Sequence, residues 1–171
     1  NWGGFIAITL NNLKVGALSY FLGIFIGIGT FYVLLNNCIM LGSFQYFFYQ
    51  RDVFWESVRG IWIHGSMEIF AMVIEAGAGF ILGASILFPK TFSRLESFKI
   101  GFQNSFKIFL STMPFTFAAG FLEGYVTRYS MEMPTYLSVG IILITLSLIS
   151  FYYLIYPFIV HKKAKKYVST L

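Results

Sequence analysis

The chain has 171 residues, of which 57% are hydrophobic and only 11% are charged. Soluble domains carry about 25% charged residues, so this composition excludes a soluble globular protein and indicates an integral membrane protein or a large part of one. Cys38 is the single cysteine, which excludes an intramolecular disulfide and a cluster of cysteine metal ligands. The chain begins at Asn1 without a signal peptide, and we expect an N-terminal region to be missing.

The formal net charge of +5 does not indicate a nucleic-acid partner, because the sequence contains no nucleic-acid recognition motif. The basic residues instead cluster at 90–107 and 162–166, beside apolar runs. Positive charge in this position marks the cytoplasmic side of a membrane protein. We therefore predict a cytoplasmic C-terminus, a cytoplasmic segment at 90–107 and an outer loop at 127–135.

Four apolar runs are long enough to cross a membrane, which takes about 20 residues. They lie at residues 15–35, 61–88, 108–126 and 136–160. We predict an all-α fold, a single membrane domain in which a polytopic bundle of transmembrane helices is accompanied by interfacial amphipathic helices.

The segment at 38–60 mixes aromatic side chains with polar and charged ones. Such a mixture suits the headgroup region of a bilayer. An interfacial or re-entrant hairpin fits this composition, and so does one short fifth crossing built from residues 31–49. The sequence leaves both interpretations open.

The segment at 90–107 has aromatic and aliphatic residues at spacings of three and four, with basic and polar residues between them. This pattern predicts an amphipathic helix that lies on the cytoplasmic membrane surface or docks on a cytoplasmic protein. The residues expected to make that contact are Phe92, Leu95, Lys99, Phe102 and Phe106.

Four ionisable residues, His64, Glu68, Glu75 and Glu123, interrupt the apolar runs. Each costs about 2.5 kcal/mol or more in hydrocarbon, so they are expected to face the bundle interior, a partner or water. Helical spacing places the first three near one face. They fit a proton or cation relay, a site for a polar substrate group, or structural pairing. His64 and one glutamate provide too few ligands, so we predict no metal site.

Glycine pairs spaced four apart occur three times, at Gly23/Gly27, Gly79/Gly83 and Gly120/Gly124. Small residues at this spacing allow helix backbones to approach closely. The pattern predicts a close-packed bundle whose acidic side chains point inward.

No catalytic motif is recognisable. The chain contains neither the G-x-S-x-G turn of hydrolases nor the phosphate-binding loop of nucleotide hydrolases. We therefore expect a protein that is not an enzyme and that needs no cofactor.

Several stretches, taken together, resemble the stage II sporulation protein M family of bacterial and archaeal membrane proteins. They are Asn11-Asn12-Leu13-Lys14-Val15, residues 23–30, Asn36-Asn37, Leu41-Gly42, Ile63-His64-Gly65-Ser66-Met67-Glu68, residues 76–83, Leu87-Phe88-Pro89, residues 119–124 and Thr127-Arg128. The resemblance covers most of residues 5–130. Besides His64, Glu68 and Glu123, it marks as motif positions Asn36, Asn37, Gly65, Gly120 and Gly124.

The resemblance implies a multi-pass protein of the prokaryotic cytoplasmic membrane, with a cytoplasmic part and a further helix before Asn1. The founding member of the family acts in an envelope machine that remodels peptidoglycan, as a scaffold for degrading partners. Our leading hypothesis is a non-enzymatic scaffold or subunit of an envelope complex. The alternative is a transporter or permease subunit that handles protons, ions or a polar solute.

Expected partners are the lipid bilayer and other envelope membrane proteins, among them peptidoglycan-active proteins or a separate ATPase. A homo-oligomer is also compatible with the sequence.

Overall fold

The computed structural model describes residues 2–168, and all regular structure within them is helical. The elements are α1 (Trp2–Phe21), the 3-10 turn η1 (Leu22–Ile24), α2 (Ile28–Tyr49), α3 (Phe54–Leu87), α4 (Arg94–Phe121), the π-helical turn η2 (Leu122–Val126), the 3-10 turn η3 (Thr127–Tyr129), α5 (Thr135–Ser150), the π-helical turn η4 (Phe151–Ile155) and α6 (Tyr156–Val168). The predicted all-α fold is confirmed.

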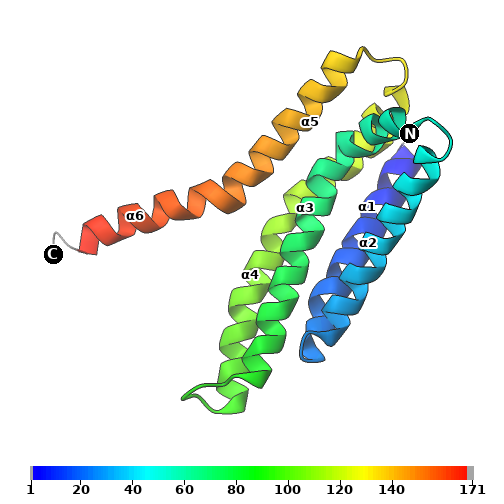
Figure 1. Cartoon of the computed structure of the whole chain (residues 1–171). Helices are drawn as coiled ribbons and strands as arrows, with labels where there is room; N and C mark the ends of the chain where they lie inside the picture. Colours follow the sequence, from blue (N-terminus) through cyan, green and yellow to red (C-terminus); the bar gives the residue numbers. More distant parts are fainter. Residues whose placement is uncertain (1, 169–171) are drawn as a thin grey trace.

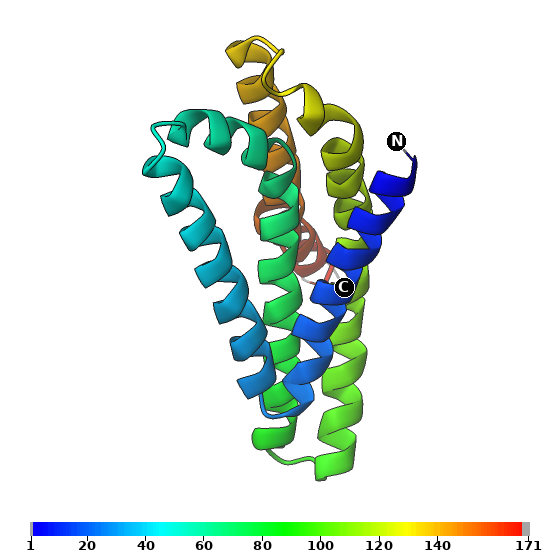
Figure 2. The ribbon, with the colours of Figure 1, turned by 90° about the vertical axis from the view of Figure 1, so that its right-hand side faces the viewer.

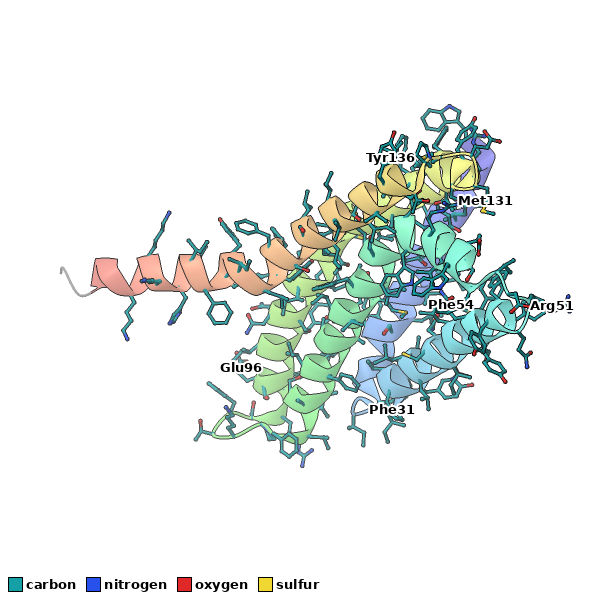
Figure 3. The ribbon with its side chains drawn as sticks, turned by 45° about the horizontal axis from the view of Figure 1, so that its top comes forward. Phe31, Arg51, Phe54, Glu96, Met131 and Tyr136 are labelled. Carbon is teal, nitrogen blue, oxygen red and sulfur yellow. The ribbon has the colours of Figure 1, made fainter. Side chains whose placement is uncertain are left out.

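The long helix α3 is the centre of the bundle, and α1, α2, α4 and α5 all pack against it. Successive helices run antiparallel, so the 50–53 and 130–134 turns lie at one end and the α1–α2 and α3–α4 turns at the other (Figures 1 and 2). Figure 3 shows Arg51 and Met131 toward the first end and Phe31 and Glu96 toward the second.

Four helical stretches are long and apolar enough to cross a membrane. They are Trp2–Ile24, Phe54–Leu87, Arg94–Tyr129 and Thr135–Lys165. The protein is therefore a multi-pass membrane protein, as predicted. In the last stretch, α5 continues through η4 into α6 as one rod, which leaves the bundle obliquely (Figure 1).

The predicted first span at 15–35 is not one helix. It contains the end of α1, a reversal of the chain and the start of α2. The reversal uses left-handed backbone at Ile26 (φ 51°) and Gly27 (φ 84°), a region that glycine adopts without steric cost. Hydropathy indicates that a segment is apolar but not that it is straight, which is why the run suggested a single helix.

Residues 38–60, for which the sequence leaves two interpretations open, are divided between two long helices. Residues 38–49 belong to α2, which lies beside α1 along the bundle, and residues 54–60 begin α3. With 22 residues, α2 is about 33 Å long at 1.5 Å per residue. It is not among the four helical stretches that are apolar enough to cross a membrane, so the choice between the two interpretations stays a prediction.

The segment at 90–107 is not a separate helix, because α4 begins at Arg94 and continues without a break to Phe121. Ser93 caps its first turn by accepting a hydrogen bond from the backbone N–H of Glu96. The predicted span at 108–126 is therefore the second half of this helix and the turn η2 that follows it.

The small residues of α4 make its closest contacts. Ser97 Oγ donates to the carbonyl oxygen of Ser85 at 2.7 Å, and the Ser105 hydroxyl lies 3.0 Å from the Tyr20 hydroxyl. Gly101 lies against Ser85 so closely that a Cβ would collide with it.

The predicted contact residues of this segment lie in two different environments. Phe102 and Phe106 are half-buried and pack against the core cluster around Tyr20 and Phe109. Phe92, Leu95 and Lys99 are exposed. Part of the apolar stripe therefore belongs to the core, and only its N-terminal part is available to lipid or a partner.

Glycines let α1 and η1 approach α3 backbone to backbone. A Cβ on Gly23 would collide with the backbone of Gly79, and a Cβ on Gly83 would collide with the backbone at Gly27 and Gly23. Thr30, in α2, donates a 2.7 Å hydrogen bond to the carbonyl oxygen of Ser19 beside this contact. All four predicted packing glycines thus meet at one helix crossing.

Substituting Gly79→Ala should lower stability by about 1–3 kcal/mol, because the new methyl group meets the Ser19 carbonyl oxygen and the Thr30 hydroxyl. The matched control is Gly77→Ala, since no atom lies within 4 Å of a Cβ at Gly77 and the gain in helix propensity is the same. Thermal unfolding in detergent measures both. Equal midpoints for the two variants would contradict the close packing.

Candidate functional site

Glu75 lies in the centre of the bundle and is 3% exposed. The Thr112 hydroxyl of α4 lies 2.7 Å from its Oε1 and donates a hydrogen bond to it. On the other side, the Glu75 carboxylate occupies the space where a Cβ of Gly16 in α1 would be. The carboxylate is therefore enclosed by three helices, and a glycine at position 16 is required to make room for it.

His64 is held by two residues that follow α4. Its Nδ1 lies 3.0 Å from Thr127 Oγ1, and its Nε2 lies 3.9 Å from Glu123 Oε2. Glu123 and Thr127 are four residues apart, so they project from one side of the helical segment formed by η2 and η3. The His64 and Glu123 side chains are 13% and 31% exposed, respectively, so this contact is largely shielded.

Glu68 completes the cluster, because one potential ligand atom from each of His64, Glu68 and Glu123 lies within 4.8 Å of the others. The spacing along α3 predicted that His64 and Glu68 share a face. Glu123 follows them by more than fifty residues and joins them only through the packing of α3 against η2.

Two cavities connect this cluster with Glu75. The larger one, of about 370 Å³, is lined by all three cluster residues and by Asn37 of α2. The smaller one, of about 90 Å³, shares Asn37 and Glu68 with it and reaches Glu75. The four ionisable residues singled out in the sequence therefore line neighbouring spaces.

A third cavity, of about 370 Å³, extends from His64 to Ser130 and Met131 at the end of the bundle. The three cavities together follow α3 from the 50–53 and 130–134 turns to Glu75. Beyond Glu75, the glycine contacts at Gly23 and Gly79 close the α1–α3 interface. The row of cavities thus approaches the bundle centre from one end.

The two asparagines marked by the resemblance differ in position. Asn36 is exposed, whereas Asn37 is half-buried and lines both cavities next to Glu68. The side-chain amide of each donates to a carbonyl oxygen one turn earlier in α2, at 2.7 and 2.9 Å.

Asn12 is a site residue that our sequence reasoning did not select. It lines the smaller cavity, and its buried side-chain amide faces the carboxylate of Glu68. Its signal in the sequence is a carboxamide close to the start of an apolar run. That signal becomes specific only when α1 is placed against α3.

The marked glycines position the elements that carry the site. Gly65 is buried and lines the larger cavity beside His64. Gly120 packs against Thr9, and Gly124 packs against Phe5. The last two contacts hold the end of α4 and η2 against α1, which places Glu123 opposite His64.

A family comparison covers the region that contains this site. The family model described as Stage II sporulation protein M matches residues 1–128, more than half of the chain. The chain belongs to the stage II sporulation protein M family. In this family member the matched region includes the cluster, Glu75 and the lining of the two cavities between them, and it ends before Ser130 and Met131 of the third cavity and before α5. Neither a curated protein nor a solved structure matches the chain.

The Thr112–Glu75 hydrogen bond should contribute to the stability of the bundle. Thr112→Val removes the donor without changing the volume much, and it should cost about 1–3 kcal/mol because a buried carboxyl group loses its partner. Thr112→Ser keeps the hydroxyl and should stay much closer to the parent protein. Thermal unfolding in detergent compares them, and a Thr112→Val variant as stable as Thr112→Ser would contradict a role for the hydrogen bond.

Proposed function

We propose that this protein is a non-enzymatic subunit or scaffold of a cell-envelope assembly in the prokaryotic cytoplasmic membrane. The family membership supports this proposal, and so does the absence of a catalytic motif in the sequence. The observation that carries it is the rod of α5, η4 and α6, which leaves the bundle (Figure 1).

The rod presents most of its surface outward. Only 17% of its most apolar stretch is buried, compared with 39% for α3 and for α4. Beyond Tyr153, which contacts Phe70 and Phe115, the part of α6 that the structure describes packs closely only against η4. Tyr156 and Phe158 are exposed, and Phe158 is 76% accessible. Such a surface suits contacts with helices of other membrane proteins as well as with lipid.

The distribution of charge supports a cytoplasmic C-terminus. The α3–α4 turn lies at the end opposite to the 50–53 turn, whereas α6 extends sideways from the middle of the bundle (Figures 1 and 2). The basic residues Lys90 and Arg94 belong to that turn and the start of α4, and Lys162 and Lys163 belong to α6. Since positive charge is retained on the cytoplasmic side, the α3–α4 turn and the basic part of α6 are each assigned to the cytoplasm by their lysines and arginines.

Mild-detergent purification of the full-length protein from its native membrane tests the scaffold proposal. We expect envelope membrane proteins, among them peptidoglycan-active ones, to co-purify in stoichiometric amounts and to be identified by mass spectrometry. The double variant Tyr156→Ala/Phe158→Ala should reduce their yield several-fold, because it removes two exposed aromatic contacts of α6.

The matched control is Tyr136→Ala, which changes an aromatic residue that is 79% exposed at the far end of the rod (Figure 3). It should leave the yield of partners unchanged. Turnover or flux on a defined substrate by the purified protein alone would contradict the scaffold proposal.

A transporter or permease subunit is the second candidate, and the row of cavities between His64 and Glu75 favours it. In that case Glu68 and Glu123 handle protons, ions or a polar solute, and a separate ATPase is one source of energy. The variants Glu68→Gln and Glu123→Gln should then abolish flux in reconstituted vesicles while expression is preserved.

The control for this candidate is Glu132→Gln, a change at an exposed residue in the turn after η3 that should retain flux. A folding defect in Glu68→Gln and Glu123→Gln would instead identify these acids as structural partners, because disruption of a buried pair can cost about 3–5 kcal/mol.

A further inference from the structure

We propose that His64, Glu68 and Glu123 bind one divalent transition-metal ion of the Zn²⁺ or Mn²⁺ type. The site lies at the contact of α3 with η2, and the ion would connect these two elements. This inference goes beyond the scaffold function, because a metal site concerns the bundle itself and not the surface of the rod.

The ligand set of the cluster suits a transition-metal ion. Each of the three residues has a ligand atom within 4.8 Å of the others, and they come from two separate segments. Ligands around one ion at bond lengths of about 2.0–2.2 Å lie roughly 3–4 Å apart. Side-chain rotations that move the ligand atoms by about 1 Å therefore suffice to bring all three within bonding distance of one ion. One imidazole with two carboxylates suits zinc or manganese better than calcium or magnesium, which prefer oxygen ligands only.

His64 is oriented as a metal ligand would be. Its Nδ1 is occupied by the Thr127 hydroxyl at 3.0 Å, so Nε2 is directed at Glu123, 3.9 Å away. A histidine that ligates a metal with one ring nitrogen nearly always engages the other in a hydrogen bond, which fixes the ring and its tautomer. The Thr127 contact supplies this outer partner.

The charge of the cavity favours a bound cation. No lysine or arginine lines the cavity, so its two carboxylates face a single imidazole. The nearby arginines have other partners: Arg59 Nη1 donates to Thr135 Oγ1 at 2.9 Å, and Arg128 lies over the rings of Tyr125 and Tyr129. The remaining lining is mostly aliphatic, aromatic or methionine. Two carboxylates in such surroundings are balanced well by a divalent cation.

The cavities give an ion both space and access to the cluster. The cavity of about 370 Å³ leaves room for water in the coordination positions that the three side chains do not fill. The cavity that begins at His64 and ends at Ser130 and Met131 offers an entrance from the end of the bundle. An ion can therefore reach the cluster without passing through the glycine contacts of α1 and α3.

Glu123 lies in a π-helical turn, Leu122–Val126. Such turns are rare and recur at functional sites, where the widened turn changes the direction in which side chains point. Here the segment after α4 presents Glu123 to Nε2 and Thr127 to Nδ1 of the same imidazole. A bound ion would join α3 to this segment more firmly than the contacts of His64 with Thr127 and Glu123 do.

Metal analysis of the full-length protein tests the proposal. The detergent-purified protein is treated with a chelator, incubated with ZnCl₂ or MnCl₂, desalted and analysed for metal per chain. We expect about one equivalent and a rise in the unfolding temperature. His64→Ala and Glu123→Gln should lose this equivalent, and Thr127→Val should weaken metal binding by about 10–100-fold.

Two matched controls exclude adventitious sites. His161→Ala removes the other histidine, and Cys38→Ser removes the exposed thiol. Both variants should retain the full equivalent. Less than a tenth of an equivalent in the parent protein at saturating zinc and manganese would overturn the proposal, and so would unchanged binding in His64→Ala and Glu123→Gln.

Zinc K-edge absorption of the loaded parent protein gives a result that does not depend on the folding of variants. We expect a shell of nitrogen and oxygen with one imidazole. A shell that contains sulfur, or two or more imidazoles, would assign the metal to other residues and overturn the site.

Discussion

The close approach of α1 and η1 to α3 is the constraint on which the rest of the structure depends. At Gly23, Gly79 and Gly83 the backbones touch, and no side chain larger than hydrogen fits between them. Contacts of this kind stabilise membrane helices, because water is absent and association relies on packing and polar contacts. The same approach brings Gly16 onto the carboxylate of Glu75 and places Gly83 against the chain reversal at Gly27.

The arrangement of polar groups follows from this packing. Because α1 is held against α3 at one end, the ionisable face of α3 is enclosed toward the other end by α2 and η2, where the cavities lie. Glu75 is satisfied by Thr112, whereas His64, Glu68 and Glu123 meet in a space without a basic partner. A closely packed half and a half with cavities thus occur in one bundle. The packed half contains the glycine contacts, and the other half contains the cavities and the ionisable side chains that line them.

The two proposals concern different parts of the molecule. The family match ends at residue 128, so the cluster lies inside it and the rod of α5, η4 and α6 lies outside it. The rod is suited to contacts with partners, and the cluster is suited to an ion. A metal that joins α3 to η2 would also stabilise the start of the segment leading to α5, which connects the bundle to the rod.

The sequence by itself determined that the protein is helical, lies in a membrane and carries four ionisable residues in apolar surroundings. Composition and the length of the hydrophobic runs give this information because they depend directly on whether a segment is surrounded by lipid or by water. The resemblance that it carries also identified the family. Tertiary structure decided the rest. The run at 15–35 is equally apolar whether it is straight or reversed, and the stripe at 90–107 has the same period whether it faces lipid or Tyr20. Glu123, Thr127 and Asn12 join the α3 face only by contacts between distant segments, and local sequence spacing contains no information about such contacts.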